Sequence, residues 1–140
     1  MTLLTKFQKL AKSFENEAES NNNSVESLSL INLEEYNTYY NELKEKYGIE
    51  MVKKWPERTD PSKFVFEDVA IATYLLLLWR QERKQLNTDK LQSFVDLGCG
   101  NGLLVYLLSS EGHPGYGIDL RKRGIWDIYP STTILKVNEL

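Results

Sequence analysis

The residues best suited to chemistry lie in one stretch, residues 94–102, which reads FVDLGCGNG. Its carboxylate, Asp96, is followed by three alternating glycines, Gly98, Gly100 and Gly102. Glycine lets a backbone turn sharply and approach a ligand with no Cβ in the way. A second carboxylate, Asp119, stands roughly 20 residues beyond the turn, where a dinucleotide-binding fold places the acid that accepts hydrogen bonds from ribose hydroxyls. The spacing predicts a binding site for a molecule that contains a nucleoside.

Two strands and a helix must hold this turn in place. Residues 94–97 form a short apolar run of the kind that is buried on both faces of a parallel sheet. After Gly102 leucines recur at helical spacing, so a helix is expected to start at about Asn101, with its free N–H groups facing the turn. A polar turn separates this helix from a second strand, residues 115–119. We therefore expect an α/β fold, with the first, incomplete part of a Rossmann-like sheet in residues 91–140.

The glycine spacing discriminates between ligands. A dinucleotide fingerprint reads G-x-G-x-x-G, and its third glycine would fall on Leu103; this chain has G-x-G-x-G instead, which makes a poor NAD site. An acidic residue followed by G-x-G-x-G resembles motif I of the class I S-adenosylmethionine methyltransferases. That resemblance implies S-adenosylmethionine as cofactor, with Asp96 near its methionine end and Asp119 on its ribose. The other interpretation is a tight turn that binds no ligand.

The chain before the first strand, residues 1–90, is expected to form a helical region. Residues 3–18 have apolar side chains at helical spacing opposite a lysine-rich face, which predicts an amphipathic helix. A polar linker follows near residues 20–24. A second helix should start after Asn32 as its N-cap and end at Gly48, because glycine is common at helix C-termini.

A long helix should lead into the first strand. Asp60 or Thr59 caps it, Pro61 fits its first turn, and the helical pattern extends to about Gln85. Its middle is apolar nearly all round, which predicts burial on several sides and packing against the sheet. A short helical piece over residues 49–55 comes before it.

Composition limits the functional classes. The chain has 140 residues, of which 41% are hydrophobic, so we expect one ordinary domain with enough apolar residues for a core. The net charge of −3 does not indicate a nucleic-acid binder, so such a role must rest on local basic patches. The single cysteine, Cys99, excludes a disulfide framework and a cysteine-based metal site within the chain. With no secretory pattern and no run that spans a bilayer, we expect a cytoplasmic protein without membrane contact and without a metal centre.

Three segments together carry a more specific resemblance. They read WPERTDPSKFVFEDVAIATYLLLLW at residues 55–79, FVDLGCGNGLLVYLL at residues 94–108, and GYGIDLRKRGIWDIY at residues 115–129. With them the chain resembles the tRNA (uracil-2′-O-)-methyltransferase family over roughly residues 40–130. The resemblance implies methyl transfer from S-adenosylmethionine to the ribose 2′-hydroxyl of a uridine in tRNA.

The same resemblance implies the site residues. Phe64 and Glu67, on the long helix, border the methionine end of the cofactor pocket or else serve packing and helix capping. No residue is assigned as the general base. His113, the single histidine, is expected to be a solvated turn residue rather than a catalyst. The residues that match the cofactor-binding motif are Asp96, Gly98, Gly100, Asn101, Gly102 and Asp119.

A basic run after the second strand is the best candidate for contact with tRNA. Arg121, Lys122 and Arg123 stand close to Trp126 in the sequence. Three cations beside an aromatic ring can neutralise phosphates and stack on a base or on adenine. The other interpretation is an ordinary solvated loop with a buried tryptophan.

The chain departs from the family at its C-terminal end. A complete methyltransferase sheet needs more strands than follow here, since only a possible third strand, residues 133–137, precedes Leu140. The catalytic loop is therefore expected to be missing. One interpretation is the cofactor-binding part of a tRNA ribose methyltransferase, active when its sheet is complete; the other is a truncated non-catalytic isoform or a cofactor- or partner-binding module. An unfinished sheet edge exposes backbone and apolar groups, which predicts self-association or a partner there.

Overall fold

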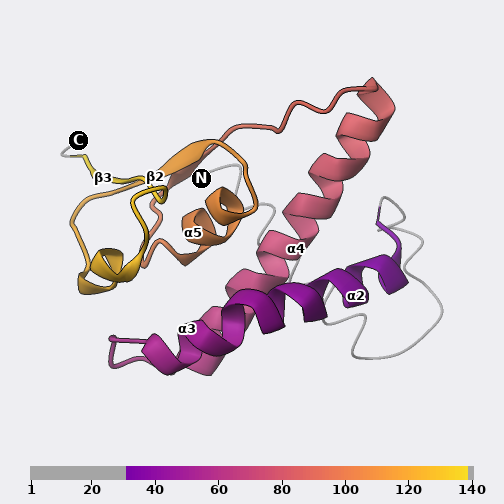
Figure 1. The fold of residues 1–140 in the computed structure, drawn as a ribbon. Coiled ribbons are helices and arrows are strands. Elements are labelled where there is room, and N and C mark those ends of the chain that lie inside the picture. The colour runs from indigo at the N-terminus through magenta and orange to yellow at the C-terminus, as the bar shows by residue number, and fades with distance from the viewer. Residues whose placement is uncertain (1–30, 139–140) are drawn as a thin grey trace.

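A computed structural model of the chain describes residues 31–138. The predicted helix over residues 3–18 and the predicted linker near residues 20–24 lie outside the described residues. Within residues 31–138 the order of elements is helical first and then mixed, with a small parallel sheet near the C-terminal end (Figure 1).

The helices begin where side chains can cap them. Helix α2 (Leu33–Leu43) starts after Asn32, whose Oδ1 accepts a hydrogen bond from the Glu35 N–H at 3.1 Å. Helix α4 (Pro61–Leu86) starts after Asp60, whose Oδ1 accepts from the Ser62 N–H at 3.0 Å, and ends at Asn87 in the left-handed conformation. Asp60, rather than Thr59, is therefore the N-cap, and the predicted extent of the long helix is confirmed.

Gly48 does not end the second helix, contrary to the sequence prediction. The chain passes from α2 through a π-helical turn, η2 (Lys44–Gly48), directly into α3 (Ile49–Lys54), and Gly48 itself has helical φ and ψ of −65° and −47°. A Cβ on Gly48 would stand 3.2 Å from the Phe66 ring of α4. Gly48 therefore allows the helices to pack closely and does not form a left-handed cap. The local sequence does not distinguish between these two roles of a glycine. Both α2 and α3 pack on α4, and Figure 1 shows α2 crossing α4 at an angle.

The sheet holds three parallel strands in the order β1 (Phe94–Leu97), β2 (Gly115–Asp119), β3 (Leu135–Val137). In register, Asp96 pairs with Gly117 and Gly117 pairs with Leu135. Helix α5 (Leu103–Ser110) connects β1 to β2, and the 3₁₀ helix η3 (Gly124–Ile128) lies between β2 and β3. Both predicted strands around the glycine turn are confirmed, and the third is shorter than predicted.

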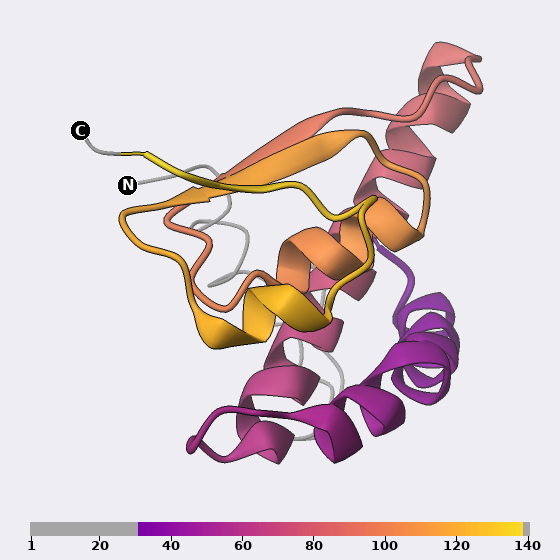
Figure 2. The ribbon, with the colours of Figure 1, turned by 60° about the vertical axis from the view of Figure 1, so that its left-hand side comes forward.

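Helix α5 lies between the sheet and α4, as the two views of the ribbon show (Figure 2). Its Leu103, Val105 and Leu108 are completely buried. Helix α4 also reaches the sheet, because the rings of Trp79 and Phe94 stack with centroids 6.3 Å apart. The core therefore joins the helical region to one face of the sheet. Among residues 31–138, none of the helices combines the length and the apolar composition that a bilayer crossing requires.

Strand β1 is not buried on both faces, which corrects the sequence prediction. Its side chains alternate, with Phe94 and Asp96 buried and Val95 and Leu97 exposed by 40% and 52%. The reason is that α4 and α5 cover one face only, and β1 is an edge strand within residues 31–138. Apolar residues in a strand indicate that the strand is buried, but they do not tell which of its faces another element covers.

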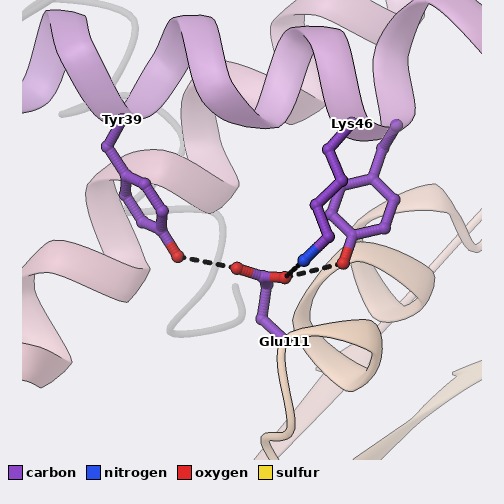
Figure 3. A network of polar contacts seen from close by, with 4 residues as sticks. Tyr39, Lys46 and Glu111 are labelled. Carbon is purple, nitrogen blue, oxygen red and sulfur yellow. Dashed lines mark hydrogen bonds and ion pairs between the residues drawn. The ribbon is translucent and has the colours of Figure 1, made fainter.

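One carboxylate ties the helical region to the sheet region. Glu111, which follows α5, accepts hydrogen bonds from the Tyr39 hydroxyl at 2.8 Å and the Tyr47 hydroxyl at 2.6 Å. Lys46 Nζ lies 2.8 Å from the same carboxylate. Figure 3 shows these donors reaching Glu111 from the α2–η2 segment. Burial raises the pKa of Glu111, but the hydrogen bonds from the lysine and the two tyrosines outweigh it, so the pKa lies below its ordinary value.

Glu111→Gln should lower the free energy of unfolding by about 1–3 kcal/mol at neutral pH, because a charged acceptor of several hydrogen bonds is lost. The Lys46 side chain is 59% exposed, so most of the effect should come from the tyrosine hydroxyls. Because the pKa of Glu111 is lower in the folded than in the unfolded chain, its charge stabilises the fold at pH values above the unfolded pKa. That stabilisation is lost as the pH falls through the folded pKa. The difference between variant and wild type in urea titrations should therefore shrink in acid. Glu45→Gln, an exposed carboxylate on η2, is the control, and equal losses in the two variants would contradict the role of Glu111.

Candidate cofactor site

The glycine turn after β1 adopts a backbone that only glycine tolerates well. Gly98, Gly100 and Gly102 have φ values of +75°, +56° and +78°. These values lie in the left-handed region, which is sterically costly for residues with a Cβ. The three predicted glycines therefore have a conformational cause, and each alternates with a residue of ordinary φ.

The N–H groups of the turn are used inside the protein. Gly98 and Cys99 donate to the Ile118 carbonyl at 2.8 and 3.0 Å, and Gly100 donates to Asp119 Oδ2 at 2.7 Å. A phosphate site at a helix N-terminus needs N–H groups that point at the ligand. These three N–H groups point to β2 and not to a ligand, and the Gly102 N–H donates within the turn to the Cys99 carbonyl at 3.0 Å.

Helix α5 starts two residues later than predicted, and its first N–H is occupied. Gly102 is the N-cap residue, and the Leu103 N–H donates to Asn101 Oδ1 at 2.9 Å. The expectation of free N–H groups facing the turn from Asn101 onward is therefore wrong at Leu103. The Asn101 Oδ1 thus acts as a local cap, while the role of Asn101 at a ligand stays a prediction.

Asp119 closes the turn from the end of β2. Its Oδ2 accepts from the Gly100 N–H at 2.7 Å and its Oδ1 from the Leu120 N–H at 2.6 Å. A carboxylate offers about four lone-pair positions, so each oxygen can still accept one more hydrogen bond. Asp119 can therefore hold the turn and accept from two hydroxyls at the same time.

Two further carboxylates stand behind the turn. Asp96 is 5% exposed, and no hydrogen-bond donor within residues 31–138 reaches its side chain. Burial raises the pKa of Asp96 to about 6, and the charge of Asp119 adds to the shift. Burial also raises the pKa of Asp68 to about 7, with added repulsion from Asp96 and Glu67. Asp68, on α4, was not singled out in the sequence, since a single acid in a helix has no local signature.

Affinity for S-adenosylmethionine should rise by at least about tenfold from pH 5.5 to 7.5, because Asp96 and Asp68 become anionic while the ligand carries cationic sulfonium and ammonium groups. Stability should run the other way: these carboxyls hold protons in the folded state above their unfolded pKa, so the free energy of unfolding falls as pH rises through about 4 to 7. Calorimetric titration in two buffers of different ionisation enthalpy measures both affinity and proton release. Asp68→Asn should flatten the profile; an unchanged profile would contradict the assignment.

Phe64 and Glu67, predicted to border the cofactor pocket, lie at the start of α4. Both lie in the first two turns of α4 and are half-buried. Glu67 is close enough to Asp68 to raise its pKa, and Asp68 in turn interacts with Asp96. The Phe64 ring lies under Lys63 Nζ at 5.8 Å from its centroid. The start of α4 therefore approaches the end of β1, while the role of Phe64 at a ligand stays a prediction.

The aromatic residue of the basic segment points inward. Trp126 is only 8% exposed, and its Nε1 donates to the Gly100 carbonyl at 2.8 Å. Stacking of Trp126 on an RNA base is therefore ruled out for this conformation, and the interpretation of a buried tryptophan is favoured. Tyr129, which the sequence analysis missed, donates from its hydroxyl to the Asn101 carbonyl at 2.9 Å. No spacing rule links a loop aromatic to a carbonyl so far back in the chain.

The three basic residues do not act alike. All are exposed, but Lys122 forms an ion pair with Asp127 at 2.7 Å. The guanidinium of Arg123 lies over the glycine turn, because a Cβ on Gly100 would stand 3.9 Å from its Cζ. Arg121 is exposed. Arg123 therefore lies toward the glycine turn, whereas Lys122 pairs with Asp127.

Cys99 and His113 are structural. Cys99 is buried in the turn, and burial raises the pKa of its thiol to about 12, so it behaves as the small, unreactive residue that was expected. His113 is not the solvated residue that was predicted. It is 3% exposed, its Nδ1 lies 2.9 Å from the Gln92 carbonyl, and its ring packs on Trp79 at 4.5 Å. Within residues 31–138 no group of histidine, cysteine and carboxylate side chains is arranged to hold a metal ion.

Comparison with known sequences places this turn in a family. The sequence model described as "Predicted AdoMet-dependent methyltransferase" matches residues 30–140, which include both carboxylate-bearing strands. The chain belongs to this methyltransferase family. S-adenosylmethionine is therefore the family's cofactor, in agreement with the glycine spacing.

Curated relatives of this methyltransferase family are named more specifically. A "Probable tRNA (uracil-O(2)-)-methyltransferase" of Homo sapiens is 64% identical over 110 residues, covering 79% of this chain and 14% of the relative. The Xenopus laevis protein of the same name is 63% identical, covering 79% and 16%. The "tRNA (uracil-O(2)-)-methyltransferase" of Schizosaccharomyces pombe is 54% identical over 97 residues, covering 69% and 19%. The chain thus spans less than a fifth of these relatives, and no solved structure matches it.

Proposed function

We propose that this chain carries the first half of the S-adenosylmethionine site of a tRNA (uracil-2′-O-)-methyltransferase, on a Rossmann-like sheet. The observation that carries the proposal is the glycine turn itself. Its three glycines are left-handed, the Gly98 and Cys99 N–H groups donate to β2, and the Asp119 carboxylate accepts from the Gly100 N–H. Asp119 would accept hydrogen bonds from the ribose hydroxyls. Asp96 and Asp68 would face the cationic methionine end, and Gly98, Gly100 and Gly102 would keep the backbone clear of the cofactor.

The residues fit the needs of methyl transfer to a hydroxyl. When bound, S-adenosylmethionine supplies a methyl group activated by a positive sulfonium, which an oxygen nucleophile displaces in line. The chain contributes binding and orientation, and alignment alone is worth roughly 7–11 kcal/mol of the barrier. A general base adds about 10²–10⁴-fold, and no described residue takes that role. The carboxylates near the turn are engaged with the cofactor end of the site.

The substrate proposal rests on the names of the relatives and on one local patch. Relatives at 54–64% identity are named as tRNA methyltransferases that modify uracil nucleotides. Arg121 and Lys122 are exposed beside the proposed cofactor site, where they would neutralise tRNA phosphates. These relatives' names favour the enzyme over a non-catalytic binding module. The single cysteine fits a reducing, cytoplasmic setting.

The proposal is tested in two steps. Calorimetry should detect binding of S-adenosylmethionine and of S-adenosylhomocysteine, with no binding of NAD⁺ under the same conditions. When the later strands of the methyltransferase sheet are supplied, labelled methyl groups should then be transferred to tRNA, and nuclease digestion should recover them on ribose, as 2′-O-methyluridine. Recovery on the base would overturn the ribose assignment. Binding without transfer would restrict this chain to the cofactor part of the reaction.

Residues 31–138 are proposed to act as one unit, with the helical region continuing into the sheet rather than forming a separate module. The Glu111 network and the packing of α5 on α4 support this arrangement. The exposed Val95 and Leu97, on an edge strand, support self-association or a partner at that face. Sedimentation velocity should show oligomers that Val95→Lys disperses, and a monomeric wild type at all concentrations would contradict self-association.

A further inference from the structure

The carbonyl side of the glycine turn is held by a segment that is far away in the sequence. Trp126 Nε1 donates to the Gly100 carbonyl at 2.8 Å, and the Tyr129 hydroxyl donates to the Asn101 carbonyl at 2.9 Å. Both contacts are partly buried, and they join residues 26 and 28 positions apart in the chain. Two consecutive carbonyls of the turn are therefore fixed by two side chains of one segment.

The N–H side of the same turn is held by β2. Gly100 donates to Asp119 Oδ2 at 2.7 Å, so its peptide groups are bound on both sides. Glycines at positive φ have wide conformational freedom, and a turn of three such glycines would otherwise sample many shapes. A ligand that requires one shape then binds with lower affinity, because ordering the turn costs free energy.

Trp126 and Tyr129, which together we call the clamp, are themselves packed against other parts of the protein. The Tyr129 ring stacks on Tyr106 of α5 with centroids 5.2 Å apart, and a Cβ on Gly102 would stand 3.3 Å from Tyr129 Cε2. The Trp126 N–H of the backbone donates to the Arg123 carbonyl at 3.0 Å, and Ile125 beside it is completely buried. The two donors therefore come from a packed segment and not from a free loop.

We propose that Trp126 and Tyr129 are positioning residues of the cofactor site, which hold the Gly100 and Asn101 carbonyls so that the glycine turn keeps its ligand-binding shape. This inference rests on the proposed cofactor site. The segment after β2 would then have two roles. Its aromatic side chains hold the carbonyls of the turn, and Arg121 and Lys122 stay exposed for other contacts.

The test uses Trp126→Phe and Tyr129→Phe, which keep an aromatic ring and remove one donor each. Trp55→Phe is the matched control for the indole, since Trp55 Nε1 donates to Thr59 Oγ1 at 3.1 Å, away from the turn. Tyr106→Phe is the control for the hydroxyl, because Tyr106 stacks on Tyr129 but donates no hydrogen bond to the described turn. Amide hydrogen exchange by NMR on the free chain and calorimetric titration with S-adenosylmethionine are measured for all five proteins.

Each clamp variant should speed exchange of the Gly100 and Gly102 amides by roughly three- to tenfold and weaken S-adenosylmethionine binding by a similar factor, with exchange in α4 unchanged. A role in packing alone predicts instead that exchange rises throughout the core or not at all, and either result overturns the proposal. If the wild type binds and the clamp variants bind equally well, the clamp is wrong and the cofactor site stands. If the wild type does not bind, the proposed function fails and the clamp fails with it.

Discussion

Asp119→Asn should weaken binding of S-adenosylmethionine by at least about a hundredfold. Asparagine offers one acceptor oxygen where the carboxylate offers two, and those two already serve the Gly100 and Leu120 N–H groups at 2.7 and 2.6 Å. The variant therefore loses the charge-assisted hydrogen bonds proposed for the ribose, at roughly 1.5–3 kcal/mol each, and leaves a backbone donor facing an amide. Calorimetric titration at constant pH measures the change.

The matched control is Asp127→Asn, an exposed carboxylate close by in the sequence that pairs with Lys122 at 2.7 Å. It removes the same charge from the chain but does not touch the turn. Its affinity should stay within about twofold of the wild type, because exposed ion pairs contribute little. If both variants bind like the wild type, Asp119 does not contact the cofactor and the predicted site is wrong.

Gly117→Ala should lower the free energy of unfolding by about 1–3 kcal/mol, because the strand has no room for a side chain at this position. Gly117 lies in the middle strand, between Asp96 and Leu135. An added Cβ would stand 2.8 Å from Cys99 Cβ and Sγ and from Val105 Cγ2. Contacts this short require β2, the glycine turn or α5 to move. Chemical denaturation gives the loss directly.

The same substitution should also reach the ligand. Cys99 lies inside the turn, so its displacement would shift Gly98 and Gly100 with it, and affinity for S-adenosylmethionine should fall together with stability. Gly124→Ala is the control, since no atom lies within 4 Å of its added Cβ. It should be neutral in both measurements. A Gly117→Ala chain as stable as Gly124→Ala would show that the sheet and turn are packed less tightly than the structure indicates.

Much of the local structure was predictable because local rules decide it. The strand at residues 94–97, the strand at residues 115–119 and the long helix after Asp60 follow from apolar period, turn residues and capping, which depend on neighbours in sequence. The glycine turn followed for the same reason, since left-handed backbone restricts residue type at each position independently. Its spacing also separated a phosphate-free nucleoside ligand from a dinucleotide.

Gly48 and His113 show where local rules stop. A glycine near a helix end is equally compatible with a cap and with close packing, and the Phe66 ring on another helix decides between them. A histidine in a polar turn looks solvated until the Trp79 ring is seen to cover it. In both cases the deciding atom belongs to an element that the local window does not contain.

By itself, then, the sequence determined the strands, the glycine turn, the carboxylate that follows it and the kind of ligand they suit, because backbone conformation and periodicity are short-range properties. Only the tertiary structure decided that Trp126 and Tyr129 turn inward to the Gly100 and Asn101 carbonyls, and that Asp68 joins Asp96 behind the turn. The direction in which a loop or helix side chain points is set by packing and hydrogen-bond partners that are distant in the chain, and those exist only once the chain has folded.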